Sequence, residues 1–122
     1  MTDKNNKTAI QNKTAIQNKT AIQTAAAPSA IGPYSQAIRS GDTVYLSGQI
    51  AIDPTSGELM LHASAAEQTE RVMRNLAAVL KAAGAGLNDL VKVGIFLADM
   101  DDFTAVNAVY ASHLEAPFPA RA

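Results

Sequence analysis

The side chains best suited to chemistry in this 122-residue chain are few and far apart. Cysteine is absent, which excludes a cysteine nucleophile, a thiolate zinc site and a disulfide framework. The two histidines, His62 and His113, stand alone and 51 positions apart, and we expect no metal and no organic cofactor. The remaining candidate is Arg121, which follows a rigid Pro-Phe-Pro approach in "APFPARA" (116–122).

A second polar candidate, Asn107, lies on the apolar stripe of a predicted helix. The segment "DDFTAVNAVYASHL" (101–114) would bury Phe103, Val106, Asn107 and Tyr110. Leaving a buried amide unpaired costs about 1–3 kcal/mol, so Asn107 must find partners or face a cavity. A structural asparagine with partners in the core is the favoured interpretation, and contact with a ligand is the alternative.

The elements that would position these residues begin with a hairpin. "YSQAIRSGDTVYLSGQIAID" (34–53) predicts two strands joined around Gly41, which can take the positive φ of a tight turn. A second turn follows in "DPTSGE" (53–58), where Pro54 and Gly57 punctuate the chain.

Two helices and one further strand complete the pattern. Ser64 and Glu67 form a capping box before a helix that Gly84 ends, with the apolar positions Val72, Leu76, Val79, Leu80 and Ala83 at helical spacing. "DLVKVGIFLADM" (89–100) predicts a strand, and the helix over 101–114 follows. This order predicts an α+β fold with both helices on one face of a mixed sheet. The other face, apolar near 50–52, would be a subunit interface.

The first 27 residues differ in character from the rest. The hexapeptide NKTAIQ occurs three times from Asn6 to Gln23, and its period of six gives no helical stripe. We therefore expect residues 1–27 to be a disordered low-complexity tail and residues 28–122 to be a single domain. The three N-x-T sequons within the repeats are interpreted as accidental.

The charge distribution excludes several partners. The formal net charge is −1, but residues 28–122 carry six basic and ten acidic residues, a net charge of −4. A domain of this sign has no electrostatic footprint for nucleic acid, and the four tail lysines are too dispersed to anchor a membrane. No segment is apolar enough to span a bilayer, so we expect a soluble, cytoplasmic protein.

Five motifs in order give the chain a resemblance to a known family. "IGPYSQAI", "VYLSGQIAIDPTSGEL", "NLAAVLKAAG", "DLVKVGIFLADMDDFTAVNAVY" and "PFPAR" together resemble the RidA/YjgF family of reactive intermediate deaminases. The resemblance covers residues 28–122. It implies a chorismate-mutase-like α+β fold, a homotrimer with active sites in clefts between subunits, and hydrolysis of enamines and imines such as 2-aminoacrylate to 2-keto acids and ammonia.

The resemblance also implies the site residues. Arg121, in the "FPAR" motif, would bind the substrate carboxylate, because a guanidinium offers two planar donors and stays charged. Tyr34 would close over the ligand, Ser47 and the backbone of Gly48 would offer polar contacts, and Asn107 would face the cavity.

One departure bears on activity. Members of the family continue beyond this arginine with two more strands, the second carrying a glutamate that positions water, and neither is present in the sequence. We therefore expect little turnover from the chain as given. The alternatives are a catalytically inactive module that binds small carboxylates, and a relative of the translation-inhibitor type, which the negative domain disfavours.

Overall fold

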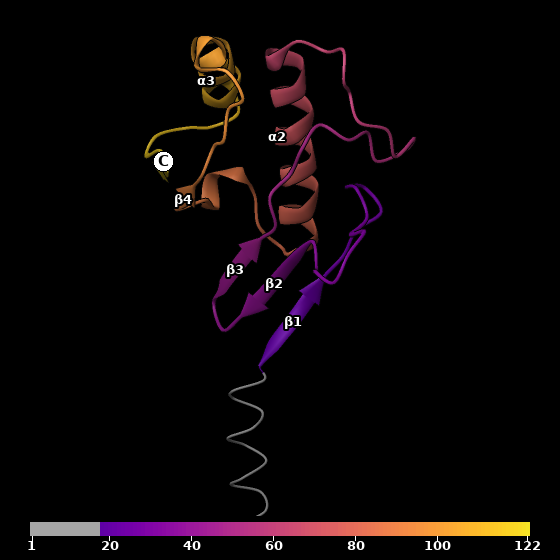
Figure 1. Ribbon diagram of the computed structural model, residues 1–122. Helices are drawn as coiled ribbons and strands as arrows, with labels where there is room; N and C mark the ends of the chain where they lie inside the picture. Colours follow the sequence, from indigo (N-terminus) through magenta and orange to yellow (C-terminus); the bar gives the residue numbers. More distant parts are fainter. Residues whose placement is uncertain (1–17) are drawn as a thin grey trace, which may run out of the picture.

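The computed structural model describes residues 18–122, and residues 1–17 lie outside the described part (Figure 1). The elements, in chain order, are β1 (Lys19–Ile22), β2 (Ala37–Ser40), β3 (Thr43–Leu46), α2 (Ala65–Ala82), the 3-10 turn η1 (Leu87–Asp89), β4 (Lys92–Val93), the 3-10 turn η2 (Met100–Asp102), α3 (Phe103–Ser112) and β5 (Ala120–Arg121). Helices and strands are mixed in one chain, which confirms the α+β class.

The hairpin is the first predicted feature that the structure confirms. Strands β2 and β3 pair antiparallel, with Ser40 opposite Thr43. The two residues between them begin with Gly41 at φ 59°, the positive φ that a type II′ turn requires at its first central position. The turn around Asp53 also forms, with Gly57 at φ 75° and its amide donating to the Asp53 carbonyl at 2.8 Å.

The predicted boundary of the tail is wrong for residues 18–27. Strand β1 lies inside the range expected to be disordered and pairs antiparallel with β2. Ile22 is buried in a core cluster with Ala27 and Ala37, so ordering comes from tertiary contacts that a local period cannot reveal. The part of the tail prediction that concerns residues 1–17 lies outside the described residues.

This correction changes the expected effect of truncation. Deleting residues 1–23 removes β1 and the buried Ile22 side chain, a loss of about 2 kcal/mol, and should lower the melting temperature by roughly 10 °C. Deleting residues 1–17 is the matched control and should leave it unchanged within about 2 °C. Thermal unfolding by circular dichroism measures both, and equal melting temperatures for the two deletions would show that β1 adds nothing.

Helix α2 begins and ends as its sequence predicts. The Ser64 hydroxyl accepts the Glu67 amide at 3.1 Å, and the Glu67 carboxylate accepts the Ser64 amide at 3.0 Å. At the other end Gly84 has φ 82°, and the amides of Gly84 and Ala85 donate back to Lys81 and Leu80 in a Schellman arrangement. No helix in the part of the chain that the structure describes is long and apolar enough to cross a bilayer.

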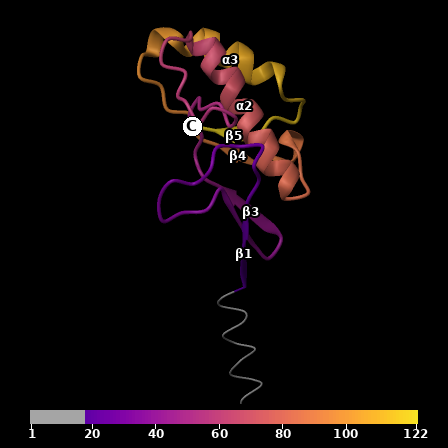
Figure 2. The ribbon, with the colours of Figure 1, turned by 90° about the vertical axis from the view of Figure 1, so that its right-hand side faces the viewer.

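Two apolar clusters hold the elements together. In the first, Val79 of α2 and the C-cap residue Ala83 pack against Ile22 and Ala37 of the three-stranded sheet. In the second, Met73 of α2 packs against α3 and β4, and its other members are Tyr110, Leu114, Leu76, Leu87, Leu90, Val93 and Ile95. Helices α2 and α3 lie side by side in both views (Figures 1 and 2).

A buried polar residue that the sequence pattern missed joins α2 to the chain after β3. Asn75 is fully buried at 0% exposure. Its amide nitrogen donates to the carbonyls of Ile52 at 3.0 Å and Ile50 at 3.4 Å, while its oxygen accepts from Arg71 Nε at 3.0 Å. All of its hydrogen-bonding groups have partners, so Asn75 fixes the path of residues 50–52 along the helix.

The long strand expected over 89–100 is mostly absent. Only β4 has ladder pairing, parallel to β5, and the two strands form a sheet separate from β1–β2–β3. The backbone pairing extends one residue beyond β5, since the amide of Ile95 donates to the Ala122 carbonyl at 2.9 Å. The rest of the expected strand over 89–100 pairs in no ladder within residues 18–122, because a strand needs a partner as well as an apolar sequence.

Glu70 joins a salt bridge within α2 to a hydrogen bond that reaches the end of α3, which makes the packing of the helices sensitive to pH. Glu70 of α2 accepts from Arg74 Nε at 2.7 Å, and its other oxygen lies 2.7 Å from Nε2 of His113, at the end of α3. The hydrogen bond from Arg74 and then that from His113 hold the pKa of Glu70 below its ordinary value of 4.5.

Because that pKa is lowered, the stabilisation is present above pH 4.5 and is lost as the pH falls and the carboxylate gains a proton. Glu70→Gln should therefore lower the melting temperature at pH 7 and have a smaller effect at pH 3. A difference between wild type and variant that stays constant over this range would contradict the assignment.

Candidate functional site

Arg121 is held by β5 and by a side chain from α3. Within the parallel ladder Arg121 is opposite Val93, and the amide of the next residue, Ala122, donates to the Val93 carbonyl at 3.1 Å. Arg121 therefore lies in a paired strand. Its Nη1 donates to Oδ1 of Asn107 at 2.6 Å, which gives the anomalous asparagine its partner. The structure thus brings together two of the five candidate residues.

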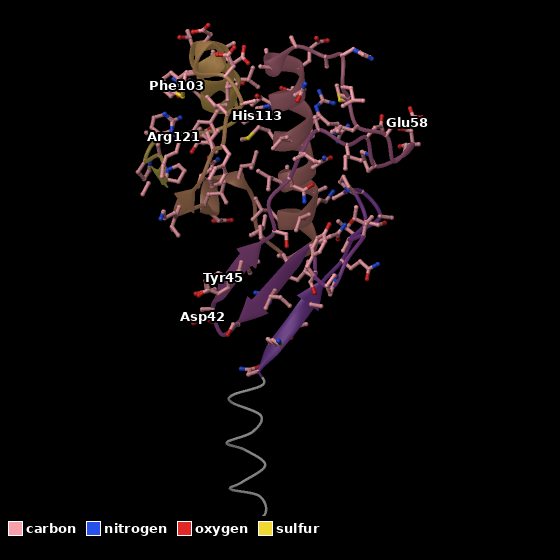
Figure 3. All side chains as sticks on the ribbon, viewed as in Figure 1. Asp42, Tyr45, Glu58, Phe103, His113 and Arg121 are labelled. Carbon is pink, nitrogen blue, oxygen red and sulfur yellow. The ribbon has the colours of Figure 1, made fainter. Side chains whose placement is uncertain are left out.

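Two aromatic rings of α3 flank the guanidinium. Its central carbon lies 5.1 Å from the centroid of the Tyr110 ring and 5.7 Å from that of Phe103, both within cation–π range. Figure 3 shows Phe103 and Arg121 on the same side of the molecule. The apolar pattern of the helix predicted only a core position for both aromatics. Their positions four and three residues from Asn107 were the signal that they share its face.

These aromatic residues differ in burial. Phe103 is 44% exposed, so its predicted place in the core is wrong, whereas Tyr110 is 6% exposed. Burial raises the pKa of Tyr110, while the charge of Arg121 acts in the opposite direction. The Tyr110 hydroxyl is buried and has no hydrogen-bond partner within the described residues.

A cavity of about 220 Å³ opens beside the guanidinium. Its polar lining comes from Arg121 and Asn107, and its apolar lining includes Ile95, Leu97 and Val106. Phe103 and Met100 complete one wall. A positive group at the edge of an apolar cavity of this size suits a small anion with a short carbon chain.

Two of the other three candidate residues line a different cavity. Tyr34 and Gly48 line a pocket of about 370 Å³ that shares no lining residue with the one beside Arg121. Ser47 is not part of that lining, and its hydroxyl donates to the Ser35 carbonyl at 2.5 Å. Tyr34 is 52% exposed, and its hydroxyl accepts from the Ile31 amide at 3.4 Å. Within one chain the five residues therefore form two groups.

A third and larger cavity separates the two groups. It has a volume of about 410 Å³, shares Gln49 and Ile50 with the Tyr34 pocket, and shares Ile95, Leu97 and Val106 with the Arg121 pocket. Tyr110 lines it as well. The two groups thus lie at separate cavities, each of which shares lining residues with the third.

Comparison with known proteins decides the family. The family model described as "Endoribonuclease L-PSP" matches residues 24–122. The chain belongs to the RidA/YjgF family. The match of the family model begins at residue 24, four residues before the range 28–122 over which the sequence motifs resemble the family.

Individual relatives of the RidA/YjgF family agree. The chain is 46% identical over 99 residues to the 2-iminobutanoate/2-iminopropanoate deaminase of Mus musculus. The aligned segment covers 81% of this chain and 73% of the mouse protein. It is 48% identical over 98 residues to a RutC family protein of Pyrococcus abyssi, covering 80% of this chain and 76% of that protein.

Solved structures of the family share the fold. RidA from the Antarctic bacterium Psychrobacter superposes with a TM-score of 0.79 at 46% identity, over 84% of this chain and 82% of that one. The E. coli YjgF protein gives a TM-score of 0.77 at 40% identity, with coverage of 84% and 82%. The predicted fold is therefore confirmed at the level of the family.

Proposed function

We propose that this chain is an imine/enamine deaminase that converts short 2-imino acids to 2-keto acids and ammonia. In this reaction 2-aminoacrylate tautomerises to 2-iminopropanoate, and water adds to the C=N carbon. The C–N bond of the resulting carbinolamine then breaks and releases ammonia and pyruvate. Nearly half of the residues aligned with the mouse deaminase are identical, which supports this reaction for the chain.

The observation that carries the proposal is the placement of Arg121. Its guanidinium donates to Asn107, stacks near two aromatic rings and borders a cavity with an apolar lining. A guanidinium keeps its charge at any working pH and offers paired donors that match a carboxylate. In this proposal Arg121 binds the carboxylate of the imino acid. The short side chain of the imino acid would occupy the apolar part of the cavity.

Asn107 has a positioning role in this proposal. Its bond to Nη1 restrains the rotamer of Arg121, which otherwise loses conformational freedom when a ligand binds. The remaining guanidinium N–H groups then face the ligand in a prepared geometry. Arg121 and Asn107 thus bind the substrate and orient its electrophilic C=N bond. We assign no general base.

Tyr34, Ser47 and Gly48 would complete the site from a neighbouring subunit. The pocket lined by Tyr34 and Gly48 is distinct from that of Arg121 within one chain, which supports a cleft formed between two copies. Tyr34, being half exposed, would cover the ligand, and the Gly48 backbone would supply polar contacts. The substrate would then be enclosed by parts of two chains.

An uncovered apolar row on the sheet supports a homotrimer. Val44 and Leu46 pack toward α2 in the first core cluster, so the alternate residues face outward. The register aligns Ala21, Ile38 and Tyr45 on this outer face, and Tyr45 is 65% exposed. An exposed apolar row of this kind is suited to burial against further subunits.

We expect sedimentation velocity to show a trimer at micromolar concentration. Tyr45→Lys should shift the distribution towards smaller species, because a lysine ammonium in the interface would lose its hydration. The matched control is Ala82→Lys, at an exposed position of α2, the helix that covers the other face of the sheet. A folded monomer for the unmodified chain would refute the assembly.

Ammonia release is the experiment that tests the function. A dehydratase acting on serine generates 2-aminoacrylate in the presence of the chain, and the rate of ammonia formation is compared with the uncatalysed rate. Acceleration in proportion to the concentration of the chain supports a deaminase. No acceleration together with measurable pyruvate binding would instead indicate the inactive carboxylate-binding module.

A further inference from the structure

One of three identical segments forms the edge of the three-stranded sheet. The hexapeptide NKTAIQ occupies residues 6–11, 12–17 and 18–23, and its third copy supplies β1. The strand residues of that copy pair with β2 from Ser40 to Ala37. The second copy therefore carries the same side chains that the edge of β2 already binds.

A shift by six residues preserves the face of every side chain. Strand side chains alternate with a period of two, so an even shift leaves inward residues inward. Lys13 would be opposite Ser40, as Lys19 is in the structure. Ile16 would replace Ile22, the buried residue of β1. The side chains of the third copy thus give it no advantage over the second.

The chain after β1 is anchored independently of the strand itself. Gln36 is 3% exposed, and its Oε1 accepts the Thr24 amide at 2.7 Å. Its Nε2 donates to the carbonyls of Thr24, Ala27 and Pro28 at 3.0, 3.3 and 2.8 Å. Gln23 is exposed. Six extra residues inserted before Thr24 would therefore leave all four bonds in place.

We propose that the edge of β2 is a strand-binding site for which residues 12–17 compete with β1. In the alternative register, residues 18–23 form a solvent-exposed loop that leads into the anchored segment. The free energy of closing such a loop grows only slowly with its length, so the shifted register is a minor but accessible state. The chain thereby carries a replacement for its own edge strand.

Pairs of introduced cysteines can distinguish the two registers, because the sequence has none of its own. Ser40→Cys with Lys19→Cys reports the register of the structure, and Ser40→Cys with Lys13→Cys reports the shifted one. Directly opposite residues in an antiparallel pair have Cα atoms about 4.5–5.5 Å apart, which suits a disulfide. The control, Ser40→Cys with Thr14→Cys, is one residue out of register and places the second thiol on the other face.

In a glutathione buffer at low micromolar protein, the Lys13 pair should close on the order of tenfold faster than the Thr14 control. Adding Ile22→Asp should raise the yield of the Lys13 disulfide and lower that of the Lys19 disulfide. Equal rates for Lys13 and Thr14 would overturn the proposal, as would a disulfide that joins two chains. Since the first comparison does not use Ile22→Asp, unfolding of that variant would not affect the result.

Discussion

Replacing Arg121 with lysine is expected to lower ammonia release from 2-aminoacrylate by a hundredfold or more. A charge-assisted bidentate contact contributes roughly 1.5–3 kcal/mol, or about ten- to a hundredfold in affinity. The loss in rate is larger if the carboxylate also sets the approach of water to the C=N bond. Lysine keeps the charge but presents one ammonium in place of a planar pair of donors.

The matched control for this variant is Arg74→Lys. Arg74 lies on α2, is 65% exposed and pairs with Glu70, so its replacement should leave turnover unchanged. If turnover by the 122-residue chain is too slow to measure, the affinity of each variant for pyruvate takes its place as the measurement. Turnover by Arg121→Lys equal to that of Arg74→Lys would show that the guanidinium geometry is irrelevant.

Asn75→Leu is expected to cost about 2–4 kcal/mol of unfolding free energy, the largest stability change among the predictions. Leucine approximates the volume of asparagine but leaves the carbonyls of Ile50 and Ile52 without their partner, and an unpaired buried group costs about 1–3 kcal/mol. The melting temperature should fall by roughly 10–20 °C.

Asn88→Leu is the control that shows whether any asparagine-to-leucine substitution in this chain destabilises it as much as Asn75→Leu. Asn88 is exposed and accepts one amide, that of Glu115, at 3.1 Å. Its replacement should change the unfolding free energy by no more than about 1 kcal/mol. Chemical denaturation of both variants gives the comparison, and equal losses would contradict the role assigned to Asn75.

Features with a local cause could be predicted from the sequence. The capping box of Ser64 and Glu67 and the positive φ of Gly41 and Gly84 all formed as expected. Each depends on residues within a few positions of one another, so a single sequence contains the necessary information. The family motifs singled out Arg121 and Asn107, whose roles stay predictions, and the structure places Nη1 of Arg121 2.6 Å from Oδ1 of Asn107.

Features that depend on distant partners could not be predicted in this way. The order of residues 18–27 arises from pairing with β2 and from the Gln36 side chain. Strand β4 is short because only Lys92 and Val93 pair with β5. Asn75 gave no signal because its partners, the carbonyls of Ile50 and Ile52, lie more than twenty positions away. In each case the deciding contact is tertiary.

The most direct test of the central claim is the affinity of the chain for pyruvate. Titration followed by NMR or calorimetry measures carboxylate binding without requiring turnover, for the unmodified chain, Arg121→Lys and Arg74→Lys. The assignment of Arg121 predicts binding that weakens about ten- to a hundredfold in Arg121→Lys and is unchanged in Arg74→Lys. Pyruvate binding of equal strength in all three proteins would contradict it.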